Sequence, residues 1–308
     1  MLIMLEVKNL KQNYRFGRNA FHGVNFSAEV GEIVCLYGKS ESGKSSLLKT
    51  LCGINKATDG TIFFDNKDIT EENTLNRNFF LLQNDFGLFK NKTVEYNLRY
   101  PLKIRKIPEQ DIFEKISFIK NKYEIYDLLH KKIKDLSEEE KVKIAFSRSE
   151  TIKRKAYLFD NPFQRIPNRM ETFVHFLPLL KELSQNHIVI YATDDTEEVN
   201  ALNTRTVVLQ YGVMEQFATI EEIKQNPASE FVYDSFYPNA VKTSGKITEE
   251  GGGIILKIND IEKIIKKESL INKIFIGDTV TVRYTDELNN IKIFDPACEK
   301  LIYFEDIY

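Results

Sequence analysis

The segment that most constrains this fold is residues 38–45, which read GKSESGKS. It follows an apolar run, residues 32–37, that is typical of a buried strand, and it leads into residues 46–51, which favour a helix. A glycine-rich turn between a strand and a helix is the context in which the pattern G-x-x-x-x-G-K-[ST] forms a phosphate-binding loop. The sequence therefore predicts a cradle for the phosphates of a nucleotide.

Each part of this loop has an expected role. Backbone N–H groups of the turn and the positive end of the following helix would hold the phosphates. Lys44 would reach the terminal phosphates, and the Ser45 hydroxyl would bind Mg²⁺. Glu41 places an acid inside the cradle, where its side chain could point to solvent because the cradle works through backbone atoms. The expected nucleotide-binding residues of the loop are Gly38, Ser40, Gly43, Lys44, Ser45 and Ser46.

Composition limits the other functions that this chain could have. The 308 residues suit one large domain with a smaller one, and a net charge of −2 does not favour a nucleic-acid partner. Its three cysteines have no paired spacing, so neither a disulfide framework nor a metal site is indicated, and a reducing cytoplasm fits. No apolar run is long enough to span a bilayer, so we expect membrane association to pass through another protein.

Polar residues at the ends of two further apolar runs are candidates for Mg²⁺ binding. Residues 79–82 end at Gln83, which could ligate the ion, orient a water or cap its strand. Residues 156–160 end in the carboxylate of Asp160, which would complete the Mg²⁺ shell. Upstream of the loop, Tyr14 could stack on an adenine ring or be a partly buried surface tyrosine.

Two prolines fall in segments with helical spacing. Residues 93–105 predict a helix that is cut short near Pro101, and residues 168–185 predict a helix that Pro178 kinks or interrupts. Between them, residues 109–150 mix apolar and charged residues at helical spacing. We therefore expect this part of the chain to be mostly helical.

The order of these parts resembles the ATP-binding subunit of an ABC transporter, nearest the branch that imports sugars and polyamines. Tyr14 matches the adenine-stacking aromatic of that family, residues 38–45 its Walker A loop, Gln83 its Q-loop and Asp160 its Walker B aspartate. Residues 136–137, Leu-Ser, precede a helix where the family has its LSGGQ signature. The tail, with the runs 277–283 and 294–296, resembles the small OB-like domain called TOBE.

The resemblance implies an α/β fold, with a P-loop ABC ATPase core in residues 1–235 and a helical subdomain near 93–150. A TOBE-like β domain would occupy residues 236–308, as a split or incomplete barrel. In the family, two such subunits close head-to-tail over ATP and Mg²⁺, joining one subunit's Walker motifs to the other's signature. The implied partners are therefore a second ABC ATPase subunit and membrane-spanning permease subunits. The implied location is the inner face of the cell membrane.

Two residues at catalytic positions of the family are changed. Asn161 stands where the family has a glutamate that polarises the attacking water, and an amide is a poor general base. Asp194 stands where the family has a histidine that contacts the terminal phosphate, and an acid there would repel that phosphate. Both changes indicate impaired hydrolysis.

The signature and the stretch after Asp160 also depart from the family. Ser137 is followed by Glu138, Glu139 and Glu140 in place of the two glycines, so that residues 137–140 predict a capping box, S-x-x-E. Acids would then lie on the positive end of that helix. Residues 163–167, FQRIP, lack the serine and aspartate of the family's D-loop.

Three functions follow from these residues. The chain could be a degenerate ATPase subunit that binds Mg-ATP, hydrolyses it weakly or not at all, and pairs with a second ATPase subunit in an importer. It could instead be an active homodimeric transport ATPase with Glu197 or Glu198 as a substitute base. A third alternative is an ATP-sensing regulatory protein outside transport. The transported solute is not indicated.

Overall fold

The computed structural model describes residues 3–13, 19–250, 253–258, 261–265, 277–285 and 289–304. A mixed ten-stranded sheet forms its centre. The strands of this sheet are β1 (Met4–Asn13), β2 (Asn19–Glu29), β3 (Ile33–Tyr37), β4 (Asp59–Phe64), β5 (Lys67–Asp68), β6 (Phe79–Leu82), β7 (Ala156–Asp160), β8 (Ile188–Thr193), β9 (Thr206–Gln210) and β10 (Val213–Ala218).

Helices cover this sheet, and a second sheet of six antiparallel strands follows near the C-terminus. The helices are α1 (Lys44–Leu51), α2 (Thr74–Arg77), α3 (Val94–Ile104), α4 (Glu109–Lys122), α5 (Glu138–Ser149), α6 (Arg169–Ser184), α7 (Thr196–Leu202), α8 (Ile220–Gln225) and α9 (Glu230–Phe236), with 3₁₀ turns at Tyr126–Leu128 and Ile133–Asp135. The second sheet contains β11 (Val241–Glu250), β12 (Gly253–Ile258), β13 (Ile261–Ile265), β14 (Thr279–Thr285), β15 (Asn289–Phe294) and β16 (Leu301–Phe304).

The large sheet combines a run of parallel strands with a part in which most neighbouring strands are antiparallel. Its order is β5-β4-β1-β2-β10-β9-β3-β8-β7-β6, and the run from β9 to β6 is parallel. Every residue of β3, β7 and β8 is buried, as expected for strands covered on both faces. Because parallel strands end at one edge, the residues that follow β3, β7 and β8 meet there. That edge is where an open α/β sheet binds its ligand.

Alternate residues of β3 enter two different cores. Cys35 and Tyr37 belong to the core that includes residues of α3 to α6, whereas Val34 and Leu36 belong to the core that includes residues of α1. Cys35 and Cys52 are both buried, which fits their role as small core residues. This two-sided packing fixes where the loop after β3 begins.

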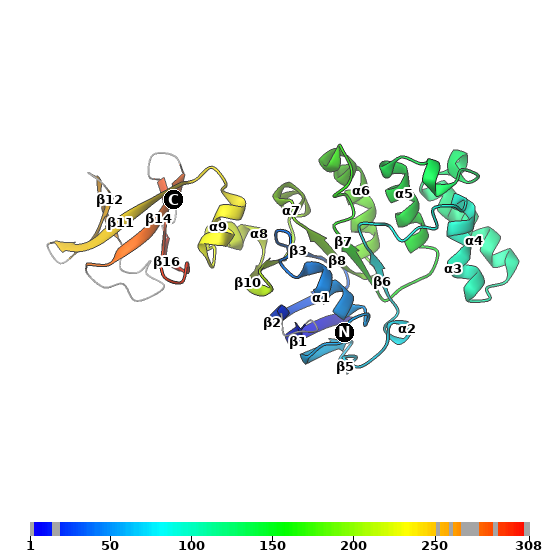
Figure 1. The fold of residues 1–308 in the computed structure, drawn as a ribbon, viewed down its shortest axis with the longest axis horizontal. Helices are drawn as coiled ribbons and strands as arrows, with labels where there is room; N and C mark the ends of the chain where they lie inside the picture. The colour runs from blue at the N-terminus through cyan, green and yellow to red at the C-terminus, as the bar shows by residue number, and fades with distance from the viewer. Residues whose placement is uncertain are drawn as a thin grey trace.

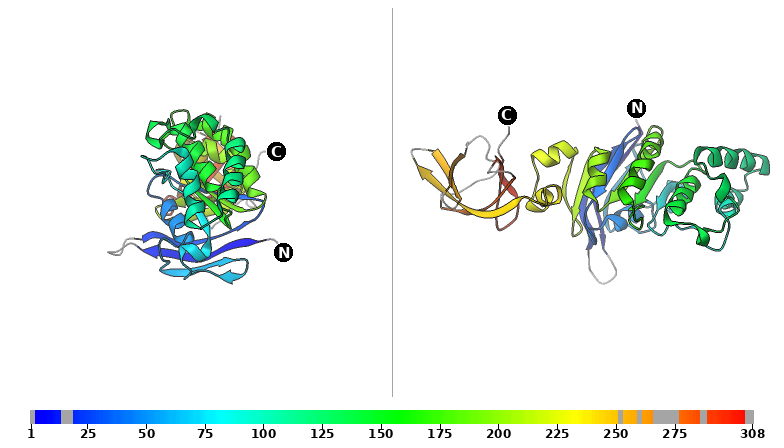
Figure 2. Two further views of the ribbon diagram at one scale, coloured as in Figure 1. Left: turned by 90° about the vertical axis from the view of Figure 1, so that its right-hand side faces the viewer. Right: turned by 90° about the horizontal axis from the view of Figure 1, so that it is seen from above.

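Helices α3, α4 and α5 lie between β6 and β7 in the chain and form one end of the molecule, opposite the second sheet (Figures 1 and 2). The expected break in α3 is wrong, because the helix continues through Pro101 to Ile104. Helix α6 likewise continues through Pro178. In both helices, buried residues lie on each side of the proline, such as Leu98 and Leu102 in α3. Their packing offsets the ~3 kcal/mol that an internal proline costs.

Helix α9 contacts both sheets. Its Phe236 ring lies 5.5 Å from the Tyr37 ring at the end of β3, and its Tyr233 ring lies 5.9 Å from the Phe294 ring of β15. The Arg283 Nε of β14 lies 3.0 Å from Glu230 Oε1, and both residues are buried. The same helix therefore connects the second sheet to the core by rings and by a buried ion pair.

Candidate functional site

The loop after β3 has the backbone shape that its glycines allow. Gly43 precedes α1 with φ at +98°, a conformation that favours glycine. A Cβ on Gly38 would lie 2.4 Å from the Leu209 carbonyl oxygen, so only glycine fits where the loop passes β9. Glu41 also has a positive φ, +65°, and its side chain is exposed. The acid is therefore in contact with solvent, and the loop backbone is the part that can hold an anion.

Lys44 begins α1 and folds back over the loop. Its ammonium group donates to the carbonyl of Gly38, to the carbonyl of Lys39 at 3.0 Å and to Ser42 Oγ at 3.1 Å. Burial lowers the pKa of Lys44, and the carboxylates of Asp194 and Asp160 act in the opposite direction. The lysine is thus a cation held at the start of a helix, where the helix dipole also attracts negative charge.

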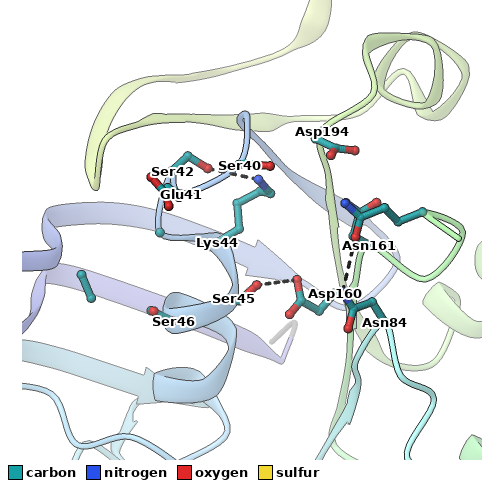
Figure 3. Close-up of a pocket in the computed structure, with 13 residues that line it drawn as sticks. Ser40, Glu41, Ser42, Lys44, Ser45, Ser46, Asn84, Asp160, Asn161 and Asp194 are labelled. Carbon is teal, nitrogen blue, oxygen red and sulfur yellow. Dashed lines mark hydrogen bonds between the residues drawn. The ribbon is translucent and has the colours of Figure 1, made fainter. Parts of the chain in front are cut away.

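Ser45 and Asp160 face each other across the floor of the site (Figure 3). The Ser45 hydroxyl donates to Asp160 Oδ1 at 3.0 Å. Burial raises the pKa of Asp160, against the hydrogen bond from Ser45 and the charge of Lys44. One hydroxyl and one carboxylate are the oxygen ligands that Mg²⁺ uses when phosphates and waters supply the rest. Among the described residues, no group of three or more histidine, cysteine, aspartate or glutamate side chains is placed to hold a metal ion.

These residues line one cavity of about 520 Å³, a size usual for small-molecule sites. The loop and α1 form one wall, and the residues after β6, β7 and β8 form the other (Figure 3). The lining residues are Ala20, Ser40, Glu41, Ser42, Gly43, Lys44, Ser45, Ser46, Asn84, Asp160, Asn161, Gln164 and Asp194. The cavity therefore brings together Asp160, Asn161, Asp194 and all of the predicted loop residues except Gly38.

A further predicted residue, Gln83, is also not among those that line the cavity. Gln83 is half-buried and does not line the cavity, whereas its neighbour Asn84 does and donates to Gln164 Oε1 at 3.3 Å. A residue that ends a strand and the residue after it point to different sides, and here the second one faces the site. Tyr14 lies outside the described residues, so its predicted contact with adenine stays a prediction.

Arg169, which we did not single out from the sequence, connects Asn161 and Asp194. Its guanidinium donates to Asn161 Oδ1 and to Asp194 Oδ1, each at 2.8 Å. Burial raises the pKa of Asp194, but the hydrogen bonds from Arg169 and Asn161 outweigh it and leave that pKa below its usual value. The carboxylate of Asp194 is therefore ion-paired in the structure, and its predicted repulsion of a bound phosphate stays a prediction.

Glu198 is a further member of this cluster that faces away from the cavity. Its side chain is fully buried, with Oε1 accepting from Arg169 Nε at 2.7 Å and Oε2 accepting from the hydroxyls of Tyr191 and Thr193. Both oxygens are occupied, and neither Glu197 nor Glu198 lines the cavity. The structure therefore does not favour either residue as a substitute base. The four acids among residues 194–198 indicate that a cationic side chain lies nearby, but the sequence does not indicate which lysine or arginine provides it.

Ser137 and Glu140 form the predicted capping box at the start of α5. Ser137 Oγ accepts from the Glu140 backbone N–H at 3.1 Å, and Glu140 Oε2 accepts from the Ser137 N–H at 2.8 Å. Glu138 pairs with Lys141 at 2.7 Å, and Glu139 is exposed. The N–H groups of Ser137 and Glu140 at the start of α5 are thus bonded to side chains of the same capping box.

We expect Ser137→Ala to lower the free energy of unfolding by about 1 kcal/mol, because it removes the cap of α5. Chemical denaturation measures this change. Ser117→Ala in the middle of α4 is the matched control, since Ser117 caps no helix and should shift stability by less than about 0.5 kcal/mol. Equal effects of the two substitutions would contradict the energetic role of the cap.

The strand, glycine loop and helix, set at the edge of this sheet, define a P-loop fold of the nucleotide-binding type. Residues 21–164 match the family model described as ABC transporter. The chain therefore carries an ABC transporter ATP-binding domain.

Several curated relatives are similar to this chain. It is 30% identical over 229 residues to the sn-glycerol-3-phosphate import ATP-binding protein UgpC of Bordetella avium, covering 74% of this chain and 63% of the relative. It is 31% identical over 231 residues to UgpC of Vibrio cholerae, covering 74% of this chain and 62% of the relative. The chain thus spans less than two thirds of the length of these relatives.

Solved structures share the fold. CbiO1 of Clostridium perfringens, described as part of the ABC transporter complex cbiONQ, superposes with a TM-score of 0.65 at 24% identity, over 72% of this chain and 91% of that one. A nucleotide-free ATP-binding cassette from an ABC transporter superposes with a TM-score of 0.64 at 22% identity, over 77% of this chain and 99% of that one. In the described residues, no helix combines the length and apolarity needed to cross a bilayer.

Proposed function

We propose that this chain is the ATP-binding subunit of an ABC import system and that it binds Mg-ATP in the cavity beside Lys44. The observation that carries the proposal is the convergence of Lys44, Ser45 and Asp160 on one cavity at the carboxyl edge of the sheet. The loop amides and Lys44 would hold the phosphates. Ser45 and Asp160 would hold Mg²⁺, which when bound neutralises phosphate charge.

The relatives support an import role. The UgpC proteins are described as import ATP-binding proteins for sn-glycerol-3-phosphate, and this chain would act in the same kind of system. Its partners would be membrane-spanning permease subunits and a second ABC ATPase subunit, at the inner face of the cell membrane. The small C-terminal sheet would be the TOBE-like part of residues 236–308. We assign no solute, because the permease and solute-binding partners would select it.

We further propose that hydrolysis at this site is weak or absent. Asn161 has no carboxylate to accept a proton from water, and its Oδ1 already accepts from Arg169. The signature helix has three acids in its first turn, and the N–H groups of Ser137 and Glu140 are already bonded in the capping box. It would therefore offer a poor anion site to a second subunit. An intact partner subunit would then be needed for transport, and ATP at this site would serve as a structural or regulatory ligand.

Purified protein tests the proposal through two measurements on one sample. We expect Mg-ATP to bind saturably and to bind more weakly when EDTA removes Mg²⁺. We expect phosphate release to be at least ~100-fold below an ordinary enzyme turnover of ~10 s⁻¹, the loss typical of a missing general base. Absence of binding would contradict the nucleotide site. Release at an ordinary rate, abolished by Lys44→Ala, would instead support the active homodimeric ATPase.

A further inference from the structure

A single guanidinium joins the ends of two strands beside the proposed nucleotide site. Arg169 begins α6, Asn161 follows β7, and Asp194 follows β8. The guanidinium donates to Asn161 and Asp194 at 2.8 Å and to Thr193 Oγ1 at 2.8 Å. Its contacts therefore fix the side chains that replace the family's water-polarising and phosphate-contacting residues.

The cluster around Arg169 contains more acids than bases. Asp194 lies 2.8 Å, Glu198 2.7 Å and Asp195 3.5 Å from guanidinium nitrogens. Glu198 is fully buried and Asp195 caps α7. Of these three acids, only Asp194 lines the cavity. Without the guanidinium, Asp194 would face the cavity without its ion-pair partner.

We propose that Arg169 is a positioning residue that neutralises Asp194 and so allows the cavity to accept the terminal phosphate of a nucleoside triphosphate. The proposal rests on the nucleotide site proposed above. Asp194 lies on the cavity wall opposite the loop that holds Lys44 (Figure 3), and Lys44 is the group expected to contact the terminal phosphates. The carboxylate of Asp194 and a terminal phosphate would both be negative, and like charges that share a partly buried site repel strongly. A diphosphate lacks the terminal group, so it should be much less sensitive to this pairing.

The test compares ATP and ADP affinities in the full chain. Because Arg169→Gln alone would leave Glu198 buried without its partner, Glu198→Gln is added to remove that charge. We expect Arg169→Gln/Glu198→Gln to weaken Mg-ATP relative to Mg-ADP by roughly tenfold or more. Adding Asp194→Asn should restore the ATP-to-ADP affinity ratio to within about threefold of the native one. Glu198→Gln alone is the matched control and should leave the ratio unchanged, with thermal melts confirming that each variant is folded.

Two further variants keep the proposal testable if the double variant does not fold. Arg169→Lys retains the charge and should preserve the ratio. Asp194→Asn in the otherwise native chain should change it by less than about threefold, because the charge that it removes is already paired. A tenfold gain in ATP preference in that variant would overturn the proposal. So would an equal loss of ATP and ADP binding in the double variant, which would mark Arg169 as a structural residue only.

The proposal can fail independently of the nucleotide site. Failure of the native chain to bind either nucleotide would contradict the proposed function itself. The native chain could instead bind both nucleotides while the Arg169 and Asp194 variants leave the ATP-to-ADP affinity ratio unchanged. That result would support the nucleotide site and overturn the proposed role of Arg169.

Discussion

Lys44→Ala is expected to weaken Mg-ATP binding by roughly 100-fold, since charge-assisted hydrogen bonds are each worth about 1.5–3 kcal/mol. In the structure the ammonium group is bonded to loop carbonyls of Gly38 and Lys39 and to Ser42, beside the cavity. Phosphate oxygens would take the place of those acceptors. Isothermal titration calorimetry with Mg-ATP measures the loss.

Lys39→Ala provides the matched control for this variant. Lys39 lies in the same loop, but its side chain is exposed and does not line the cavity. We expect its removal to change affinity by less than about threefold, since exposed charges are screened by solvent. Comparable losses in both variants would indicate that general positive charge holds the ligand, and the assigned role of Lys44 would then be wrong.

Phe163→Ala is expected to lower the free energy of unfolding by about 3–5 kcal/mol. The ring is fully buried three residues after Asp160, and it packs against the rings of Phe146, Phe173 and Phe176. Deleting it leaves a cavity under the chain segment that carries Asp160 and Asn161. Urea denaturation, followed by circular dichroism, measures the change.

Phe113→Ala is the control for that cavity effect. Phe113 is a phenylalanine on α4 with 65% of its surface exposed, so its truncation should shift stability by less than about 0.5 kcal/mol. Phe163→Leu should cost less than Phe163→Ala, since more of the volume stays filled. A loss below about 1 kcal/mol in Phe163→Ala would show that the segment is not anchored by this ring.

The parts that local sequence patterns determine could be predicted. Residues 32–37 and 156–160 read as buried strands and form β3 and β7, because parallel strands covered on both faces need continuous apolar runs. The glycine spacing of residues 38–45 likewise predicted a loop that only glycine can complete at Gly38 and Gly43. In both cases, backbone sterics and burial act within a few residues.

The parts that depend on tertiary contacts could not be predicted in this way. The helices run through Pro101 and Pro178 because residues on both sides of each proline pack in a core built from segments far apart in the sequence. Local helix propensity does not reveal this packing. Arg169 is bonded to acids that lie 25 and 29 positions further along the chain, and no local pattern selects it among 43 lysines and arginines. The choice of Asn84 over Gln83 depends on which side of the strand end faces the cavity.

Helix α9 has a practical consequence for dissecting this protein. A chain cut after Phe236 would keep the helix but lose the Phe294 ring that packs on Tyr233. The Glu230 carboxylate would lose both of its cations, Lys242 and Arg283. In the shortened chain, the Tyr233 ring and the Glu230 carboxylate would therefore become exposed to solvent. Differences between the fragment and the intact chain would then report damage at the cut as well as the missing sheet.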